Sequence, residues 1–526
     1  MQNWLVEATR FANGFGRFAK LASWLPPAAV ALVALSLRLH GLGDKPFWLD
    51  EVTTLHRATI TLPNLIAESL HSKHYPSYFM LLWLVAKLGT SQWLLRLPSA
   101  VFGAVSAALA YAIGNEADGR RTGTAAGLLL ALSPFDIQYG QEARSYTLVA
   151  CLILIALWGL VRLAREPTLV GTPLSHKHRP PLPWIAYGFG TTAALNVLNV
   201  AIPWLVAANL AALAIAWRAG EGRKAFWRNW AWVQAFVLVT WLPFFIAVCV
   251  LSHGTVLRGE GWAPPETWAT LWSIVAPVYL YRISAFITFD LMPSAVPWLS
   301  AIIALLALAG AWRLRHRPAI LAVIGGSALA LPLLLLLVSL LTPVLVARYF
   351  AWSAAPFFVL AGAGIGQLAS RRFAVAGAAI AMVALINLAP YYHDETKPRW
   401  DLAAKTLAAE AQPGDVILVD SRDAYEVFSA FAARNGLDKR VALTWTPADA
   451  ARLSPGHDLW VVYGRTGQGK MIAPADYANS LAPVGTPDTG QSFGSYVIAW
   501  RFNTPDAIAN ACGGAQTCPN PPVAQP

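Results

Sequence analysis

The stretch Phe47-Trp48-Leu49-Asp50-Glu51 follows closely on the first apolar segment of the chain, which ends at about His40. Its two adjacent carboxylates stand in a chain in which only 13% of the residues are charged. A carboxylate at a membrane face costs free energy unless it is solvated, paired or functional. The stretch therefore marks either an ordinary solvated loop or a reactive site at the mouth of a membrane span.

The composition is that of a membrane protein. Of the 526 residues, 56% are hydrophobic and 23 are Trp, and the mean hydropathy is +0.48. Apolar segments close to bilayer length recur along the chain, which predicts a polytopic α-helical membrane protein. We expect about eleven spans, at residues 25–40, 96–114, 122–135, 146–164, 184–198, 201–217, 229–251, 293–312, 319–341, 350–368 and 373–390.

The net charge of +11 reflects membrane topology rather than nucleic-acid binding, because the basic residues cluster between the apolar segments. Cytoplasmic loops are enriched in Lys and Arg. The clusters are Arg120-Arg121, residues 162–179, Arg218 to Arg228, Arg313 to Arg317, and Arg371-Arg372. All of them, and the basic N-terminus at 1–23, lie in the cytoplasm only if the apolar segment 76–89 does not cross the membrane. We therefore expect 76–89 to be an interfacial or re-entrant helix.

This topology places the unusual polar clusters of the membrane domain, residues 24–390, in one compartment. The predicted outer loops are 41–95, 133–146 and 252–292, with a further outer turn from Thr342 to Tyr349. Their convergence on one face predicts a site there.

A soluble region follows Pro390. Residues 391–503 read as a small α/β domain with about four strands, at 416–420, 440–445, 458–463 and 495–502, and a helix from Tyr425 to Asn435. The tail at 504–526 is expected to be poorly ordered. Within it, Cys512 and Cys518 have a spacing that could close a small disulfide ring in an oxidising compartment. No cleavable signal peptide is evident, so we expect the first apolar segment to remain as an anchor.

Four short motifs occur in an order that resembles family 39 glycosyltransferases, a bacterial group similar to the protein O-mannosyltransferases and the lipid A aminoarabinose transferases. They are Trp48-Leu-Asp-Glu51, His74-Tyr-Pro-Ser-Tyr78, Arg96-Leu-Pro-Ser99, and Pro134 to Tyr146 with Glu142-Ala-Arg144. Arg348-Tyr349 is similar to a later family element, and Lys397-Pro-Arg-Trp-Asp401 looks like the start of the outer domain. The second motif departs from the more usual His-Pro-Pro-Leu-Tyr.

The resemblance implies a GT-C fold and an inverting transfer. A sugar carried on a polyprenyl phosphate would move to a lipid, glycan or protein acceptor on the periplasmic face of a bacterial inner membrane, with the N-terminus cytoplasmic and the α/β domain periplasmic. An acceptor hydroxyl must lose a proton as it attacks, so a carboxylate base is needed.

By match to the family, Asp50 is the predicted general base, and its catalytic neighbour Glu51 orients an Arg or the acceptor. Negative charge grows on the leaving phosphate, so cationic groups lower the barrier. The candidates are His74, Arg96, Arg144 and Arg348, supported by Glu142, Tyr146 and Tyr349.

Each assignment has a structural alternative. Arg144 could pair with Glu142 or Asp136, His74 could be a satisfied loop histidine, Arg96 could anchor a helix end, and Arg348-Tyr349 could be an interfacial pair. The Trp residues at 262, 268 and 272 could stack on sugar or lie on the membrane in an interfacial helix. A divalent metal is conceivable because His71, His74 and His253 share the outer face, but no closed ligand set is present, and the transfer needs no cofactor.

Two other function classes fit a polytopic chain. A transporter or flippase for a lipid-linked saccharide also places polar groups at membrane depth, but here those groups sit at the outer ends of the spans. A membrane-anchored binding or assembly protein leaves Asp50-Glu51 and Glu142-Ala-Arg144 without a role. The favoured interpretation is a membrane glycosyltransferase with a polyprenyl-phosphate sugar as donor and no nucleic-acid partner.

Overall fold

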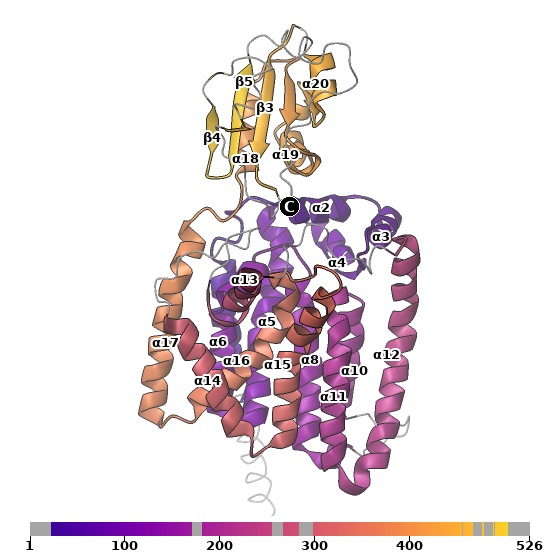
Figure 1. Cartoon of the computed structure of the whole chain (residues 1–526), viewed down its shortest axis with the longest axis vertical. Coiled ribbons are helices and arrows are strands. Elements are labelled where there is room, and N and C mark those ends of the chain that lie inside the picture. The colour runs from indigo at the N-terminus through magenta and orange to yellow at the C-terminus, as the bar shows by residue number, and fades with distance from the viewer. Residues whose placement is uncertain are drawn as a thin grey trace, which may run out of the picture.

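A long helical bundle carries a smaller α/β domain at one end (Figure 1). The structure is a computed structural model, and it describes residues 23–170, 181–254, 267–282, 298–454, 456–466, 476–477, 488 and 490–502. The bundle helices are Ser23–Leu39, α5 (Gln92–Asp118), α6 (Arg120–Ala131), α8 (Tyr146–Arg165), α10 (Leu182–Leu195), α11 (Ile202–Arg218), α12 (Arg223–Leu251), α14 (Trp298–Leu314), α15 (Pro318–Ser339), α16 (Ala351–Gly366) and α17 (Ser370–His393).

Within the described residues, each of the predicted spans contains a helix. In the part of the chain that the structure describes, seven helical segments are long and apolar enough to cross a bilayer, namely Gln92–Asp118, Tyr146–Arg165, Asn199–Arg218, Gly220–Leu251, Pro318–Ser339, Ala347–Gly366 and Ser370–His393. The helix Ser23–Leu39 and helices α6, α10 and α14 are 12 to 17 residues long. The chain is therefore the predicted polytopic α-helical membrane protein.

Two helices form the centre of the bundle. Most of α8 and α16 is buried, whereas α12 and α17 leave most of their side chains exposed and lie at its periphery (Figure 1). An exposed apolar helix is unfavourable in water but stable against lipid chains. The exposed side chains of α12 and α17 therefore mark the surface that faces the bilayer.

Glycine allows α14 and α16 to pack closely. A Cβ on Gly310 would collide with the backbone of Leu360, and a Cβ on Gly364 would collide with the backbone of Leu306. Small residues at a helix crossing let two backbones approach, which is a common mode of packing in membranes.

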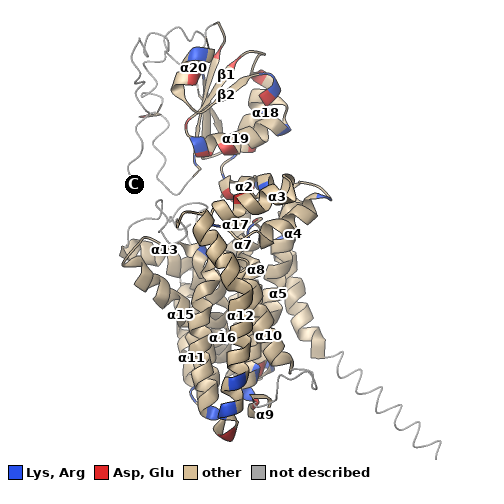
Figure 2. Ribbon diagram, turned by 90° about the vertical axis from the view of Figure 1, so that its right-hand side faces the viewer, with Lys and Arg blue, Asp and Glu red and all other residues tan. Residues whose placement is uncertain are grey.

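Short helices cover the end of the bundle that lies beneath the α/β domain (Figures 1 and 2). They are α2 (Leu49–Thr59), α3 (Leu62–His71), α4 (Ser77–Ala86), α7 (Pro134–Gly140) and α13 (Trp268–Tyr279). The ten residues of α4 rise only about 15 Å, half the thickness of the hydrocarbon core. The helix in the apolar segment 76–89 is therefore shorter than any of the bundle helices, and its interfacial or re-entrant placement stays a prediction.

Basic side chains gather at the opposite end of the bundle (Figure 2). There Glu116 pairs with Arg162 and Arg165, at N–O distances of 2.8 and 2.6 Å, and Asp118 pairs with Arg313 at 3.0 Å.

Short four- and three-residue turns of helix lie at the ends of the long helices, namely α9 (Pro167–Val170), η1 (Asn199–Ala201), η2 (Gly220–Gly222) and η4 (Ala347–Phe350).

The α/β domain has a five-stranded mixed sheet in the order β2-β1-β3-β5-β4. Its elements are α18 (Trp400–Glu410), β1 (Val416–Val419), α19 (Arg422–Arg434), η5 (Leu437–Lys439), β2 (Ala442–Thr444), α20 (Pro447–Leu453), β3 (Leu459–Gly464), β4 (Gln491–Phe493) and β5 (Val497–Phe502). Strand β1 pairs in parallel with β2 and β3, whereas β5 is antiparallel to β3 and β4.

The four predicted strands are present, and the sequence analysis missed a fifth, β4. Strands β1 and β3 are continuous apolar runs with every residue buried, which is typical of central strands covered on both faces. Strand β4 has only three residues, two of them exposed. It gives almost no periodic signal, because its place in the sheet depends on pairing with β5 rather than on its own composition.

The α/β domain contacts the short helices at this end of the bundle. Helix α19 lies against α2, and Arg434 at its end donates a hydrogen bond from Nη2 to the carbonyl of Thr90 at 3.0 Å. The predicted ring between Cys512 and Cys518, the tail at 504–526, the N-terminal segment to residue 22 and Trp262 lie outside the described residues.

Candidate active site

Helix α2 begins at the stretch from which the sequence analysis started. Trp48 is its N-cap, with extended backbone, and Asp50 and Glu51 lie in its first turn. Acidic residues are favourable there because the helix dipole is positive at its N-terminus. Successive residues of a helix point about 100° apart, so the two carboxylates face different surroundings.

Asp50 lies between two guanidinium groups. Its Oδ2 atom is 3.4 Å from Nη2 of Arg144 and 3.4 Å from Nη1 of Arg348. Arg144 also donates from Nη1 to the backbone carbonyl of Asp50 at 3.3 Å. The Asp50 side chain keeps 24% of its surface exposed. It is therefore paired with two cations and still accessible.

The charge state of Asp50 follows from this arrangement. Burial raises the pKa of Asp50, but the nearby Arg144 and Arg348 outweigh burial and bring the pKa below its usual value. Asp50 is therefore ionised at neutral pH. The Oδ2 atom is buried and makes no hydrogen bond with good geometry, so the two arginines hold it by charge.

The cations of this site come from segments far apart in the sequence. Arg144 lies in the turn between α7 and α8, and Arg348 lies in η4, directly before α16. Their guanidiniums are within 6 Å of aromatic rings, Arg144 over Tyr146 and Arg348 over Trp48 and Tyr349, at 5.9, 5.7 and 5.9 Å. The structure thus brings Asp50, Arg144, Arg348, Tyr146 and Tyr349 together as one cluster.

Arg144 pairs with Asp50 rather than with the two carboxylates that the sequence offered as alternatives. The cation that acts on Asp136 is Arg38, and the cation nearest Glu142 is Lys397. Tyr146 is buried with its ring edge against Tyr139, at a centroid distance of 5.3 Å. The Tyr146 ring therefore packs against both Tyr139 and the Arg144 side chain, whose guanidinium is 5.9 Å from its centroid.

Glu51 faces inward and is fully buried. Its Oε1 accepts hydrogen bonds from Arg96 Nε at 2.8 Å and from the backbone N–H of Ala143 at 2.9 Å. Its Oε2 accepts from Arg96 Nη2 and from Lys397 Nζ, both at 2.7 Å. Burial raises the pKa of Glu51, but Arg96 and Lys397 hold it at about 2. Glu51 therefore orients an Arg, as predicted, but it has no surface to offer an acceptor.

Arg96 has no donor left for a phosphate. Besides its two bonds to Glu51, it donates from Nη1 to the carbonyls of Leu42 and Lys45, at 3.0 and 2.8 Å, and from Nη2 to that of Pro46 at 2.9 Å. These bonds use all five N–H groups of the guanidinium. The predicted phosphate contact of Arg96 would therefore require one of these bonds to break. Arg96 instead anchors the loop before α2.

His74 lies next to Arg144, but it is neutral at neutral pH. Burial, and then the positive charges of Arg144 and Arg57, lower the pKa of His74 to about 3. The role of His74 as a cation for the phosphate stays a prediction, and it would require a bound phosphate to raise this pKa. Its Nδ1 is buried without a hydrogen-bond partner. His74 and Arg144 line a small pocket of about 10 Å³, with Tyr75, Tyr78, Phe79, Ser145, Val197 and Leu198.

The sequence analysis gave Lys397 no role, and the structure places it in the buried cluster around Glu51. It lies in the linker between α17 and α18, and its Nζ is also 3.9 Å from Oε1 of Glu142. Both carboxylate oxygens of Glu142 are buried without a hydrogen bond, and burial raises the pKa of Glu142 to about 7. The available signal was the cluster of charged residues directly after the last apolar segment.

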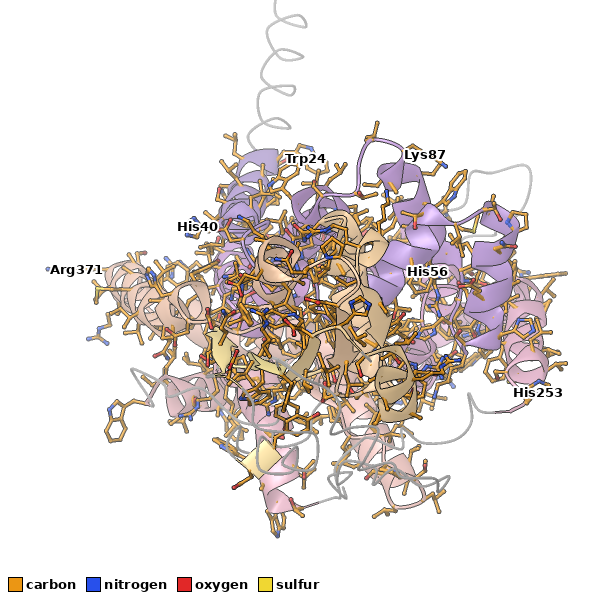
Figure 3. All side chains as sticks on the ribbon, turned by 90° about the horizontal axis from the view of Figure 1, so that it is seen from above. Trp24, His40, His56, Lys87, His253 and Arg371 are labelled. Atoms are coloured by element: carbon orange, nitrogen blue, oxygen red, sulfur yellow. The ribbon has the colours of Figure 1, made fainter. Side chains whose placement is uncertain are left out.

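Within the described ranges, no group of three or more His, Cys, Asp or Glu side chains is arranged to hold a metal ion. Seen from above, His253 lies at the rim of the molecule, far from His56 on α2 (Figure 3). Trp268 and Trp272 project outward from α13, with 87% and 48% of their surface exposed. Such exposed Trp residues at the end of a bundle are typical of a membrane interface.

The sequence of the chain matches a known protein family over part of its length. Residues 73–253 match the family model described as dolichyl-phosphate-mannose-protein mannosyltransferase. That match includes His74, Arg96, Glu142 and Arg144, and it excludes Asp50 and Arg348. A comparison with curated proteins finds no match.

Solved structures similar to the chain share the fold over almost its whole length. ArnT from Cupriavidus metallidurans in the apo state is 14% identical, with a TM-score of 0.56, over 92% of this chain and 98% of that one. The same protein bound to undecaprenyl phosphate is 15% identical, over 91% and 98%, again with a TM-score of 0.56. The archaeal oligosaccharyltransferase AglB from Archaeoglobus fulgidus, in complex with an inhibitory peptide and a dolichol-phosphate, is 13% identical, with a TM-score of 0.54, over 85% of this chain and 70% of that one.

Proposed function

We propose that the chain is a membrane glycosyltransferase of the GT-C type, which transfers a sugar from a polyprenyl-phosphate donor to an acceptor hydroxyl at the outer face of the membrane. The likeness of its fold to solved structures and the match of residues 73–253 to the mannosyltransferase family model support this proposal. The observation that carries the proposal is the cluster of Asp50, Arg144 and Arg348. It joins an accessible ionised carboxylate to two guanidiniums within 3.4 Å. Such a cluster suits a reaction that takes up a proton and releases a phosphate.

Asp50 is the general base of this reaction. The acceptor hydroxyl gives its proton to the Asp50 carboxylate as its oxygen bonds to the anomeric carbon. The bond from that carbon to the phosphate oxygen breaks on the opposite side, so the configuration inverts. A well-placed general base contributes about 10²- to 10⁴-fold to rate.

Arg144 and Arg348 stabilise the leaving group. The phosphodiester of the donor carries one negative charge and becomes a phosphomonoester, which carries more, so charge grows where the two guanidiniums can meet it. Arginine suits this role because its planar fork matches phosphate oxygens. When the donor binds, its phosphate competes with Asp50 for the same cations. The pKa of Asp50 then rises towards its usual value, and the carboxylate becomes a stronger base at the moment it is needed.

The donor class is supported by the similar structures, one of which holds undecaprenyl phosphate and another a dolichol-phosphate. The inner membrane of a bacterium is the proposed location, with the basic end of the bundle in the cytoplasm and the α/β domain in the periplasm. The distribution of Lys and Arg supports this orientation (Figure 2). The acceptor is a hydroxyl of a lipid, a glycan or a protein.

The test is sugar transfer from a panel of radiolabelled polyprenyl-phosphate monosaccharides into membrane fractions. We expect wild type to label an acceptor, and Asp50→Asn to lose about 10²- to 10⁴-fold of the rate while it still binds the donor. Asp44→Asn, an exposed acid in the same loop, is the matched control and should transfer normally. Equal labelling by wild type and Asp50→Asn would remove Asp50 from catalysis. Movement of the donor lipid between leaflets without any transfer would instead favour a transporter.

A further inference from the structure

Lys397 belongs to neither the open cluster around Asp50 nor the sheet of the α/β domain. It lies in the linker that follows the last bundle helix, and it is nevertheless one of the most buried charged side chains of the site, with 4% of its surface exposed. A buried ammonium is costly unless it is paired and hydrogen-bonded. Its position therefore needs a reason.

The linker between α17 and α18 makes hydrogen bonds both to the loop before α2 and to α2 itself. Lys45, from the loop before Phe47, donates from Nζ to Thr396 Oγ1 at 2.7 Å and to the carbonyl of Tyr391. In the second contact the linker supplies the donor, since Lys397 donates from Nζ to Glu51 Oε2 at 2.7 Å. Pro398 follows Lys397 and favours extended backbone there. Two successive linker residues are thus bonded to this region, Thr396 to the loop before α2 and Lys397 to α2 itself.

The α/β domain also reaches the same stretch by a second contact. The ring of Phe47 is buried, and its centroid lies 5.3 Å from the guanidinium of Arg434 and 5.2 Å from that of Arg96. Arg434 belongs to α19 of the α/β domain, and Arg96 holds Glu51. One contact therefore ends on Glu51, next to Asp50, and the other ends on Phe47, in the stretch that leads into α2.

The direction of Asp50 depends on how α2 is rotated about its axis. Because successive side chains of a helix diverge by about 100°, fixing Glu51 inward sets the direction in which Asp50 points. Four hydrogen bonds fix Glu51, and the bond from Lys397 is the one contributed by the linker. Loss of that bond would let the first turn of α2 rotate and would move Asp50 away from Arg144 and Arg348.

We propose that Lys397 is a positioning residue, which couples the α/β domain to the base Asp50 by holding Glu51. This inference rests on the proposed function, because it assigns Asp50 its role. It gives the α/β domain a task in the reaction that does not require the domain to touch donor or acceptor. Lys397 itself touches neither.

The experiment uses full-length protein in lipid nanodiscs and four variants. Lys397→Met removes the charge and keeps the length of the side chain, Lys397→Arg keeps the charge, and Lys405→Met changes an exposed lysine of α18 as a control. The double variant Lys397→Met with Glu142→Gln removes one positive and one negative charge from the buried cluster, so that its net charge changes less than in the single variant.

Three quantities are measured for each variant: the unfolding temperature, the affinity for the donor lipid and the single-turnover transfer rate at saturating donor. We expect Lys397→Met to lower the rate at least tenfold with less than a threefold change in donor affinity. Lys397→Arg should restore part of the rate, and the double variant should regain the unfolding temperature but not the rate. A transfer rate per folded molecule within twofold of wild type in Lys397→Met would overturn the proposal. Recovery of both stability and rate in the double variant would do so as well.

A readout without chemistry separates this inference from the proposed function. Hydrogen exchange of the backbone amides of Leu49–Thr59 reports directly on α2. Lys397→Met should speed exchange in its first turn while α16 stays as protected as in wild type, and unchanged protection of α2 would overturn the positioning role. If wild type transfers no sugar from any donor, the proposed function fails, while the exchange result still decides whether Lys397 positions α2.

Discussion

The two sides of the first turn of α2 differ sharply, although they begin with adjacent acids. On the outer side, Asp50 keeps 24% of its surface exposed and faces Arg144 and Arg348 at 3.4 Å. On the inner side, Glu51 is fully buried and accepts four hydrogen bonds of 2.7 to 2.9 Å. The outer contacts are long and open, and the inner ones are short and closed.

This difference shows how one dipeptide can serve two purposes. A carboxylate that must take a proton needs access and loosely held cations, because tight hydrogen bonds would lock it in the ionised form. A carboxylate that must hold a helix needs the opposite. Burial and the direction of each side chain, rather than residue type, assign the two roles. Each substitution proposed below removes contacts on one side of the turn and leaves those on the other side intact.

The largest effect is expected on stability, from the inner side. Glu51→Gln removes the charge that compensates buried Arg96 and Lys397, and breaking a buried ion pair from one partner costs about 3–5 kcal/mol. We expect the free energy of unfolding in detergent to fall by that amount. The measurement is denaturant or thermal unfolding followed by tryptophan fluorescence.

The matched control for Glu51→Gln is Glu68→Gln. Glu68 pairs with His56 at 3.2 Å, and both side chains are about half exposed, so its loss should cost less than about 1 kcal/mol. Equal costs for Glu51→Gln and Glu68→Gln would contradict the view that the inner side is a closed network.

On the outer side, Arg348→Met and Arg144→Met should act on rate. Each removes one of the two cations that meet the charge developing on the leaving phosphate, and loss of one such group costs about 10²- to 10³-fold. The rate of single-turnover transfer at saturating donor measures this step. Arg422→Met, an exposed arginine of the α/β domain, should transfer at the wild-type rate. A loss confined to donor affinity, with the rate unchanged, would show that the two arginines bind the donor without stabilising the transition state.

The smallest effect is expected from His74, at the edge of the outer side. Its pKa is about 3 in the folded protein, against about 6.5 in an unfolded chain. Between these values the unfolded chain binds the extra proton, so stability is full above pH 6.5 and falls as the pH drops towards 3. The contribution of His74 to this loss is about 1.4 kcal/mol per pH unit.

His74→Gln removes this titration. Its unfolding temperature should therefore fall less steeply than that of wild type between pH 6.5 and 4.5, and the control His316→Gln, on an exposed turn between α14 and α15, should behave like wild type. Parallel slopes for wild type and His74→Gln would mean that His74 is protonated in the folded protein, and it would return to the set of phosphate-binding cations.

The sequence was sufficient for the architecture of the membrane domain. Long apolar segments report directly on bilayer thickness, and basic clusters report on topology, so the spans and the short segment 76–89 could be located by length and composition alone. The sequence also predicted that Asp50, Arg144 and Arg348 share one face of the membrane domain, because all three lie in loops that the charge distribution places there. It did not predict that the two arginines pair with Asp50.

The roles within the site could not be read from the sequence in the same way. Arg96 looks as suitable for a phosphate as Arg144 does, and only the count of carbonyls around it shows that every N–H is already used. His74 looks cationic until its burial beside two arginines is known. Lys397 lies hundreds of residues from Glu51 in the chain, so no local pattern could pair them. These outcomes depend on desolvation and on contacts between distant segments.

The most direct test of the account compares Asp50→Asn with Glu51→Gln in one experiment. For each variant, the unfolding temperature, the donor affinity and the single-turnover rate per folded molecule are measured on the same preparation. We predict that Asp50→Asn remains folded and binds the donor but loses about 10²- to 10⁴-fold of its rate, whereas Glu51→Gln loses chiefly stability. If Asp50→Asn transfers sugar as fast as wild type, the assignment of the open side of this turn as the catalytic one is contradicted.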